Sequence, residues 1–149
     1  MKKNSKYRQG IYKLINPEKY KGNNRNVTYR SGWELKAMRF FDLNPNVLEW
    51  SSEEIIIPYQ NPLTGRISRY FVDFYAKMKD KQGEFKKFLI EIKPHSQTLP
   101  PVQKNRKTKS LIYQQAEYVK NQAKWKSAFD YCAKKNMNFI ILTEKHLGI

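Results

Sequence analysis

The chain has 149 residues, the length of one domain, and 29 Lys and Arg against 13 Asp and Glu give a formal net charge of +16 at pH 7. Its 40% hydrophobic content is enough for a packed core, and no apolar run matches a membrane span or signal peptide, so no membrane partner is expected. Cys132 is the only cysteine and His95 and His146 the only histidines, which excludes internal disulfides and multi-cysteine zinc sites and favours a carboxylate-bound, Mg²⁺-like ion as any catalytic metal.

Residues 1–30 are predicted to form an extended basic arm, because they hold nine Lys and Arg, one Glu and four interleaved Tyr. Charge of this kind binds polyanions by releasing counterions, and the aromatic side chains suit bases and sugars. We expect Arg25 and Arg30 to bind DNA. The alternative interpretation is a basic surface that only keeps the protein soluble, or attachment to an acidic protein or membrane face, although nucleic acid is the favoured partner. Composition does not separate DNA from RNA. Residues 31–149 are predicted to form a single domain.

Residues 31–43 are predicted to form a helix that ends at Asn44-Pro45. Its apolar residues recur at helical spacing: Trp33, Ala37, Phe40 and Phe41. Ser31 and Glu34 fit a capping box, in which the Glu34 carboxylate reaches back to the start of the helix. The functional alternative is that Glu34 is a third carboxylate directed at a metal site.

Strands are expected next over residues 47–50, 54–59, 69–78 and 85–93, of which the first two could also be one strand with a bend. The third alternates and is predicted to carry its apolar side chains on one face: Tyr70, Val72, Phe74, Ala76 and Met78. A three-residue loop with Gly83 in its last position is predicted to join the third and fourth strands. A turn centred on Gln82 places Asp73 directly opposite Glu91, with Lys93 on the same face.

The pattern Asp73-x17-Glu91-x-Lys93 contains the parts needed to hydrolyse a phosphodiester. Two opposed carboxylates repel each other unless a cation lies between them. A divalent ion there would polarise the phosphate and acidify a water molecule, while Lys93 would orient that water or neutralise developing charge. The structural alternative is a solvent-facing strand in which Glu91 and Lys93 form an ordinary exposed pair.

The last third of the chain is predicted to contain a loop, a long helix over residues 110–135 and a strand over residues 139–143. The loop is basic and is expected to bind phosphates through Lys104, Arg106, Lys107 and Lys109. The apolar stripe of the helix is predicted to be Ile112, Ala116, Val119 and Ala123. Three residues are accessory candidates for the site: His95, Gln114 and Tyr118. The element order predicts an α/β fold with a mixed sheet flanked by helices.

Five segments resemble the head-completion nucleases of T-even-type tailed phages: Asn16–Tyr20, Tyr29–Lys36, Asn44–Trp50, Pro58–Pro62 and Arg69–Phe74. The similarity extends from about residue 9 to the end. It implies a restriction-endonuclease-like core, related to the DNA-cutting subunit of some transposases. It also implies Glu34, Asp73, Glu91 and Lys93 as site residues, and Gln114 and Tyr118 are similar to an extra motif of some nucleases in that superfamily.

The resemblance further implies a role in finishing the DNA-filled head for tail joining. We therefore expect a nuclease of low sequence specificity that uses Mg²⁺ or Mn²⁺ and no small-molecule cofactor. Its partners would be the packaged genome and head portal or neck proteins, in the virion or in the host cytoplasm during assembly. The alternative function is a non-catalytic virion protein that binds DNA or the portal.

Overall fold

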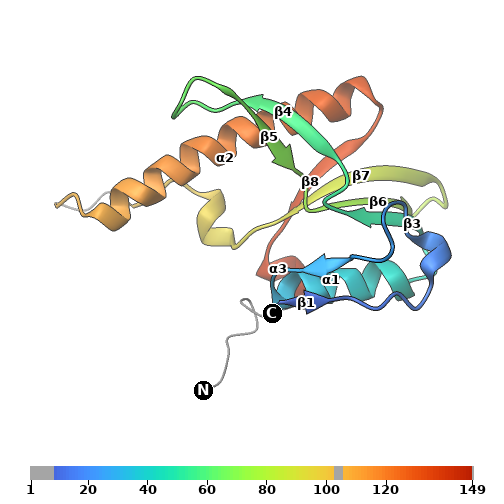
Figure 1. The fold of residues 1–149 in the computed structure, drawn as a ribbon. Helices are drawn as coiled ribbons and strands as arrows, with labels where there is room; N and C mark the ends of the chain where they lie inside the picture. The colour runs from blue at the N-terminus through green and yellow to red at the C-terminus, as the bar shows by residue number, and fades with distance from the viewer. Residues whose placement is uncertain (1–8, 103–105, 149) are drawn as a thin grey trace, which may run out of the picture.

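A four-stranded mixed sheet is the centre of the molecule in a computed structural model that describes residues 9–102 and 106–148. Its strand order is β3-β6-β7-β8, antiparallel except for the parallel β7–β8 pair. Figure 1 shows helix α1 on one side of the sheet and helix α2 on the other. The predicted mixed sheet flanked by helices is confirmed. The elements are β3 (Val47–Ser52), β6 (Phe74–Lys79), β7 (Phe85–Ile92), β8 (Asn138–Leu142), α1 (Gly32–Leu43) and α2 (Lys109–Lys134).

Both faces of this sheet are buried, because alternate side chains of each strand enter two different cores. Phe74, Ala76 and Ile90 pack on the α1 side, whereas Tyr75 and Leu89 pack on the α2 side. The centre of this sheet is therefore covered on both faces. Charged side chains within its strands include Glu49 of β3 and Lys77 of β6, which are paired in the ladder.

The two predicted helices are confirmed, but their buried faces differ from the predicted stripes. Phe40 of α1 is 50% exposed, and α1 instead buries Leu35, Ala37, Met38, Phe41 and Asp42. Ile112 and Val119 of α2 are also exposed. The buried face of α2 comprises Leu111, Asn121, Trp125, Ala128 and Cys132. The helices carry several apolar residues, and contacts made by distant elements decide which of them are covered.

The expectation of a separate extended arm is wrong for residues 9–30. This segment holds β1 (Gly10–Ile11), a 3-10 turn η2 (Pro17–Lys19) and β2 (Thr28–Tyr29), which pairs with β1. Its side chains at Tyr12, Tyr20 and Val27 belong to the core on the α1 side. Aromatic residues interleaved with the charges are thus core residues here. The basic residues before position 9 lie outside the described part of the chain.

The predicted strand over residues 69–78 is two strands. β5 (Ile67–Phe71) pairs only with β4 (Ile56–Gln60) in a separate hairpin, and β6 begins at Phe74 in the central sheet. Tyr70 and Val72 consequently pack on the α2 side, while Phe74, Ala76 and Met78 pack on the α1 side. The prediction that these five share one face is wrong, because the chain changes sheets at Asp73.

The predicted β6–β7 register is confirmed. Phe74 pairs with Ile90 and Ala76 with Phe88, as a turn centred on Gln82 requires. Gly83 has a φ of +82°, which glycine adopts without steric cost. The ladder ends one residue before Asp73 would meet Glu91, so these two carboxylates lie at the open end of the strand pair.

Two short elements complete the fold: η3 (His95–Thr98) after β7, and α3 (Glu144–Leu147) after β8. In the part of the chain that the structure describes, no helix combines the length and the apolar character needed to cross a membrane.

Candidate active site

Asp73 lies where the ends of three neighbouring strands meet. Its backbone carbonyl accepts a hydrogen bond from the amide of Glu53, just beyond the end of β3, at 3.1 Å. Its Oδ2 accepts a hydrogen bond from the amide of Ile92, at the end of β7, at 2.8 Å. Because Asp side chains bind nearby backbone amides readily, Asp73 both interrupts the strand and holds the carboxylate against β7.

Glu91 approaches the same strand end from β7 and is 7% exposed. The Tyr70 hydroxyl donates a hydrogen bond of 2.5 Å to its Oε2, and the Lys93 ammonium lies 3.6 Å from its Oε1. Tyr70 comes from β5, so the separate hairpin contributes directly to the site. The structural alternative of an exposed Glu91–Lys93 pair is therefore wrong: the carboxylate is buried and held by two different strands.

The surroundings of Asp73 and Glu91 raise the pKa of both carboxyl groups, which disfavours their ionised forms. Burial raises the pKa of Asp73 well above its ordinary value, and the nearby charges of Glu91 and Glu34 raise it further. Burial also raises the pKa of Glu91, against the opposing effects of Lys93 and Tyr70. Strong upward shifts of neighbouring carboxyls are typical of sites that bind a cation or move a proton.

Glu34 is brought near this pair by the first turn of α1. Ser31 is the N-cap, and its hydroxyl accepts a hydrogen bond from the Glu34 amide at 3.1 Å, as predicted. The Glu34 carboxylate reaches back to the amide of Arg30, at 3.2 Å, rather than to that of Ser31. Burial raises the pKa of Glu34, and the charge of Glu91 raises it as well. Glu34 thus caps the helix and lies within electrostatic reach of Glu91.

Arg30 and Glu53 form a charged pair beside these carboxylates that sequence reasoning did not find. The guanidinium donates two hydrogen bonds to Glu53, of 2.8 and 3.0 Å. Glu53 has a φ of +56°, an uncommon conformation for a residue with a side chain. The hydrogen bond to Glu53 is the largest effect that raises the pKa of Arg30. The charges of Glu53, Glu34 and Asp73 raise it further. Sequence spacing carries no signal for this pair, because β2 and β3 are joined through α1.

Lys124 is a second residue that the sequence did not identify. From α2 its ammonium lies 5.8 Å from the ring centre of Tyr59 and 5.5 Å from that of Tyr70. Burial lowers the pKa of Lys124, and the charge of Glu91 opposes that change. One lysine among many on a long basic helix is inconspicuous in the sequence. Its contact with Tyr70 places a second cation on the α2 side of the site.

The donor atoms at this site suit a hard divalent cation, which takes oxygen ligands and commonly one or two carboxylates. Asp73 and Glu91 supply those oxygens. Burial raises the pKa of both carboxyls, and the charge of Glu91 raises that of Asp73 further, so a bound cation would favour their ionised forms. Within residues 9–102 and 106–148, however, no three His, Cys, Asp or Glu side chains are arranged to hold a metal ion together. The predicted meeting of Glu34, Asp73 and Glu91 as three ligands is therefore not found there.

The described contacts of the predicted accessory residues are with other parts of the chain than the carboxylates. Gln114 and Tyr118 line a groove of about 700 Å³ between the first half of α2 and the segment around Pro100. Gln114 donates a hydrogen bond to Ser110, one turn earlier on α2. The amide of His95 donates to the Glu144 carboxylate at 2.9 Å. The structure shows no contact between these three residues and the Asp73–Glu91 pair among the described interactions.

The predicted DNA-binding residues are exposed where they are described. Arg25, Arg106, Lys107 and Lys109 all have exposed side chains. Arg30 is exposed but paired with Glu53. Lys104 lies outside the described residues.

Two comparisons with known proteins place the chain among described proteins. A family model described as "TnsA-like endonuclease N terminal" matches residues 44–144, a stretch that contains Asp73, Glu91 and Lys93 and follows Glu34. The head completion nuclease of Enterobacteria phage T4 is 38% identical to this chain over 136 residues, which cover 89% of this chain and 88% of that protein.

Proposed function

Because the chain belongs to the TnsA-like endonuclease family, we propose that it is a metal-dependent DNA nuclease whose site is Asp73, Glu91 and Lys93, with Glu34 beside them. The observation that carries the proposal is the pair of crowded carboxylates at one strand end, one of them 3.6 Å from an ammonium group. Clusters of ionisable groups with perturbed pKa values are typical of catalytic and cation-binding sites.

Each residue of the proposed site has a distinct task. Asp73 and Glu91 would hold Mg²⁺ or Mn²⁺, which when bound supplies polarisation of a phosphate oxygen and acidification of a water molecule. Lys93 places a positive charge where negative charge develops on the phosphate during attack. Tyr70 fixes the orientation of Glu91 through its hydroxyl, whose pKa is raised by burial and by Glu91 so that it stays a donor.

The proposed substrate is the backbone of DNA rather than a particular base sequence. The net charge of +16 favours contacts to phosphates. Exposed side chains that can make them include Arg25, Arg106, Lys107 and Lys109. Contacts to phosphates position a nuclease and carry little sequence information, so low specificity is expected. The likeness to the head completion nuclease of phage T4 supports a role for this chain in completing a phage head, with the packaged genome as substrate and portal or neck proteins as partners.

Cleavage of plasmid DNA by the purified protein in Mg²⁺ tests the nuclease proposal. We expect wild-type protein to cut, and Asp73→Asn and Lys93→Gln each to lower the rate at least about 100-fold. Asp73→Asn removes a carboxylate that would hold the metal ion, and Lys93→Gln removes the positive charge beside the reacting phosphate. Chelation of the metal with EDTA should stop cleavage. Linear and circular substrates in parallel separate exonuclease from endonuclease activity.

The matched controls are Asp130→Asn and Lys126→Gln, which remove one acid and one lysine from an exposed ion pair on α2. Both control variants should cut as wild type does. Cleavage that survives Asp73→Asn and Lys93→Gln would show that the activity comes from another site or a contaminant. Absence of cleavage by wild type with Mg²⁺ and with Mn²⁺ would instead favour a non-catalytic virion protein.

A further inference from the structure

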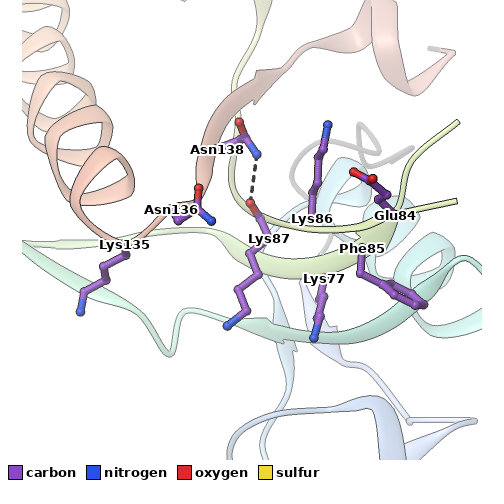
Figure 2. Close-up of a pocket in the computed structure, with 8 residues that line it drawn as sticks. All are labelled: Lys77, Glu84, Phe85, Lys86, Lys87, Lys135, Asn136 and Asn138. Atoms are coloured by element: carbon purple, nitrogen blue, oxygen red, sulfur yellow. Dashed lines mark hydrogen bonds between the residues drawn. The ribbon is translucent and has the colours of Figure 1, made fainter. Parts of the chain in front are cut away.

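A pocket rich in lysine lies at the opposite end of the central sheet from the carboxylates. Its volume is about 550 Å³, and it is formed by the end of β6, the start of β7 and the turn between α2 and β8. In Figure 2 the ammonium ends of Lys77, Lys87 and Lys135 point to the same side of the ribbon, whereas Lys86 and Glu84 point to the other. The pocket therefore presents three positive charges together.

Lys77 and Lys87 form an electrostatically unfavourable pair. They are directly opposed in the β6–β7 ladder, an arrangement in which like charges destabilise a sheet. On its other side Lys77 is opposed to Glu49 of β3, whose carboxylate accepts a hydrogen bond from the Tyr75 hydroxyl. Elsewhere on the same hairpin, Lys86 forms an ion pair of 3.1 Å with Asp80. None of the ion pairs formed within the described residues includes Lys77, Lys87 or Lys135. Lys135, at the end of α2, is the one member that the helix dipole favours.

Register connects this pocket to the proposed active site. Alternation along β7 puts Lys87 and Glu91 on the same, α2-facing side of the strand, separated by four residues and hence by about 13 Å. That separation is comparable to the width of the major groove of DNA. A duplex held at Glu91 would have backbone phosphates within reach of Lys87.

We propose that Lys77, Lys87 and Lys135 form a second binding site for DNA backbone phosphates, about one groove width from the cleavage site. The exposed ring of Phe85, 5.9 Å from the Lys77 ammonium, adds an apolar surface suited to a deoxyribose. The inference rests on the proposed function, because it takes DNA as the ligand. It assigns this protein a second anchor that keeps the substrate in register with Asp73 and Glu91.

Binding of a fluorescein-labelled 25-base-pair duplex in EDTA, followed by anisotropy at several salt concentrations, tests this site without cleavage. The Lys77→Gln, Lys87→Gln double variant should bind on the order of tenfold more weakly than wild type. The slope of log affinity against log salt should fall by about 2, one for each lost phosphate contact. The control double variant, Lys126→Gln with Lys145→Gln, removes two exposed lysines outside the pocket and should change the slope much less.

A stability measurement distinguishes loss of a contact from loss of the fold. The double variant loses the Lys77–Lys87 repulsion together with the Lys77–Glu49 attraction, so it should unfold at about the same temperature as wild type. Lys87→Glu makes an opposite-charge pair with Lys77, so it should unfold at a higher temperature and bind DNA more weakly than wild type. Increased stability combined with weaker binding is expected of a ligand site and not of a structural one.

The outcomes for this pocket and for the proposed active site are separable. Unchanged affinity and salt slope in the Lys77→Gln, Lys87→Gln variant would overturn the pocket even if wild type cuts DNA. A pocket-dependent loss of binding in a protein that cuts nothing would overturn the nuclease proposal and leave the pocket supported. Asp73→Asn should retain the pocket-dependent binding, because its carboxylate lies at the other end of the sheet.

Discussion

The position of Asp73 shows how one residue serves both fold and site. Its carboxylate binds the Ile92 amide, its carbonyl accepts from the Glu53 amide, and the chain changes sheets there. The same placement brings its charge close to Glu91 and Glu34. A position that joins three strands through hydrogen bonds is rigid, and a rigid carboxylate is what a site needs in order to hold a charged ligand without rearrangement.

Asp73→Asn should make the metal-free protein more stable, by roughly 1 kcal/mol. The substitution retains an acceptor for the Ile92 amide. It removes a carboxyl group whose pKa is raised by burial and by the charge of Glu91. A carboxyl with a raised pKa in the folded state contributes most to stability at low pH, and that contribution is lost as pH rises through the folded pKa. The variant should therefore lose less stability than wild type as pH increases above about 4.

Urea unfolding in EDTA at several pH values measures both effects. Asp130→Asn is the control, because Asp130 is exposed on α2 and should leave the pH profile of wild type unchanged. An Asp73→Asn variant that is less stable than wild type at neutral pH, or has the same pH profile, would contradict the electrostatic account of the site.

At the scale of elements, one buried side chain of α1 accepts several of the hydrogen bonds that hold the segment from β1 to β2. Asp42 is fully buried and accepts hydrogen bonds from the Tyr12 hydroxyl and from the amides of Ile15 and Asn16. Lys19, counted in the sequence among the basic residues, donates instead to the backbone carbonyls at the end of α1, with Asn44 at 2.8 Å. Part of the positive charge of residues 9–30 is therefore structural.

Asp42→Ala should lower the free energy of unfolding by about 3 kcal/mol, because it leaves a buried hydroxyl and two amides without their acceptor. Limited trypsin digestion should cut the variant after Lys19 or Lys21 faster than wild type, as the segment detaches from α1. Glu18→Ala, in an exposed position of the same segment, should match wild type in both assays. Equal protease resistance in Asp42→Ala would show that the aromatic core holds the segment without Asp42.

At the scale of the whole molecule, the site joins parts of the fold that are otherwise separate. Glu34 comes from α1, Tyr70 from the β4–β5 hairpin, Asp73 from the junction between β5 and β6, and Glu91 from β7 of the central sheet. A cation bound at Asp73 and Glu91 would relieve the repulsion among all three carboxylates. It would thereby stabilise the folded state of the whole molecule. Binding to the folded state alone raises the unfolding free energy according to ligand concentration.

Mg²⁺ or Mn²⁺ at about 100 times its dissociation constant should raise the free energy of unfolding of wild type by about 2.7 kcal/mol. The increase should be largely lost in Asp73→Asn and kept in Asp130→Asn. Thermal unfolding with and without the metal measures it. A protein whose unfolding temperature is insensitive to both ions would not have the proposed metal site.

The strand pair that carries Asp73 and Glu91 could be predicted from the sequence alone. A three-residue turn with glycine at its end and a period of two determine register locally, so the pairing of β6 with β7 follows from a short stretch of chain. The N-cap at Ser31 is local in the same way. The mixed sheet followed from the order of helices and strands, since a helical crossover between β7 and β8 permits their parallel pairing.

Only the tertiary structure decided which apolar residues are covered and which charges meet. The single alternating run over residues 69–78 carries no sign that Asp73 divides it between two sheets. Packing also decides which distant segments come into contact. Examples are the Arg30–Glu53 pair, the contact of Lys124 with Tyr70, and the opposed lysines of the basic pocket. Local rules extend over a turn or a strand pair, whereas these contacts depend on how all layers of the fold are assembled.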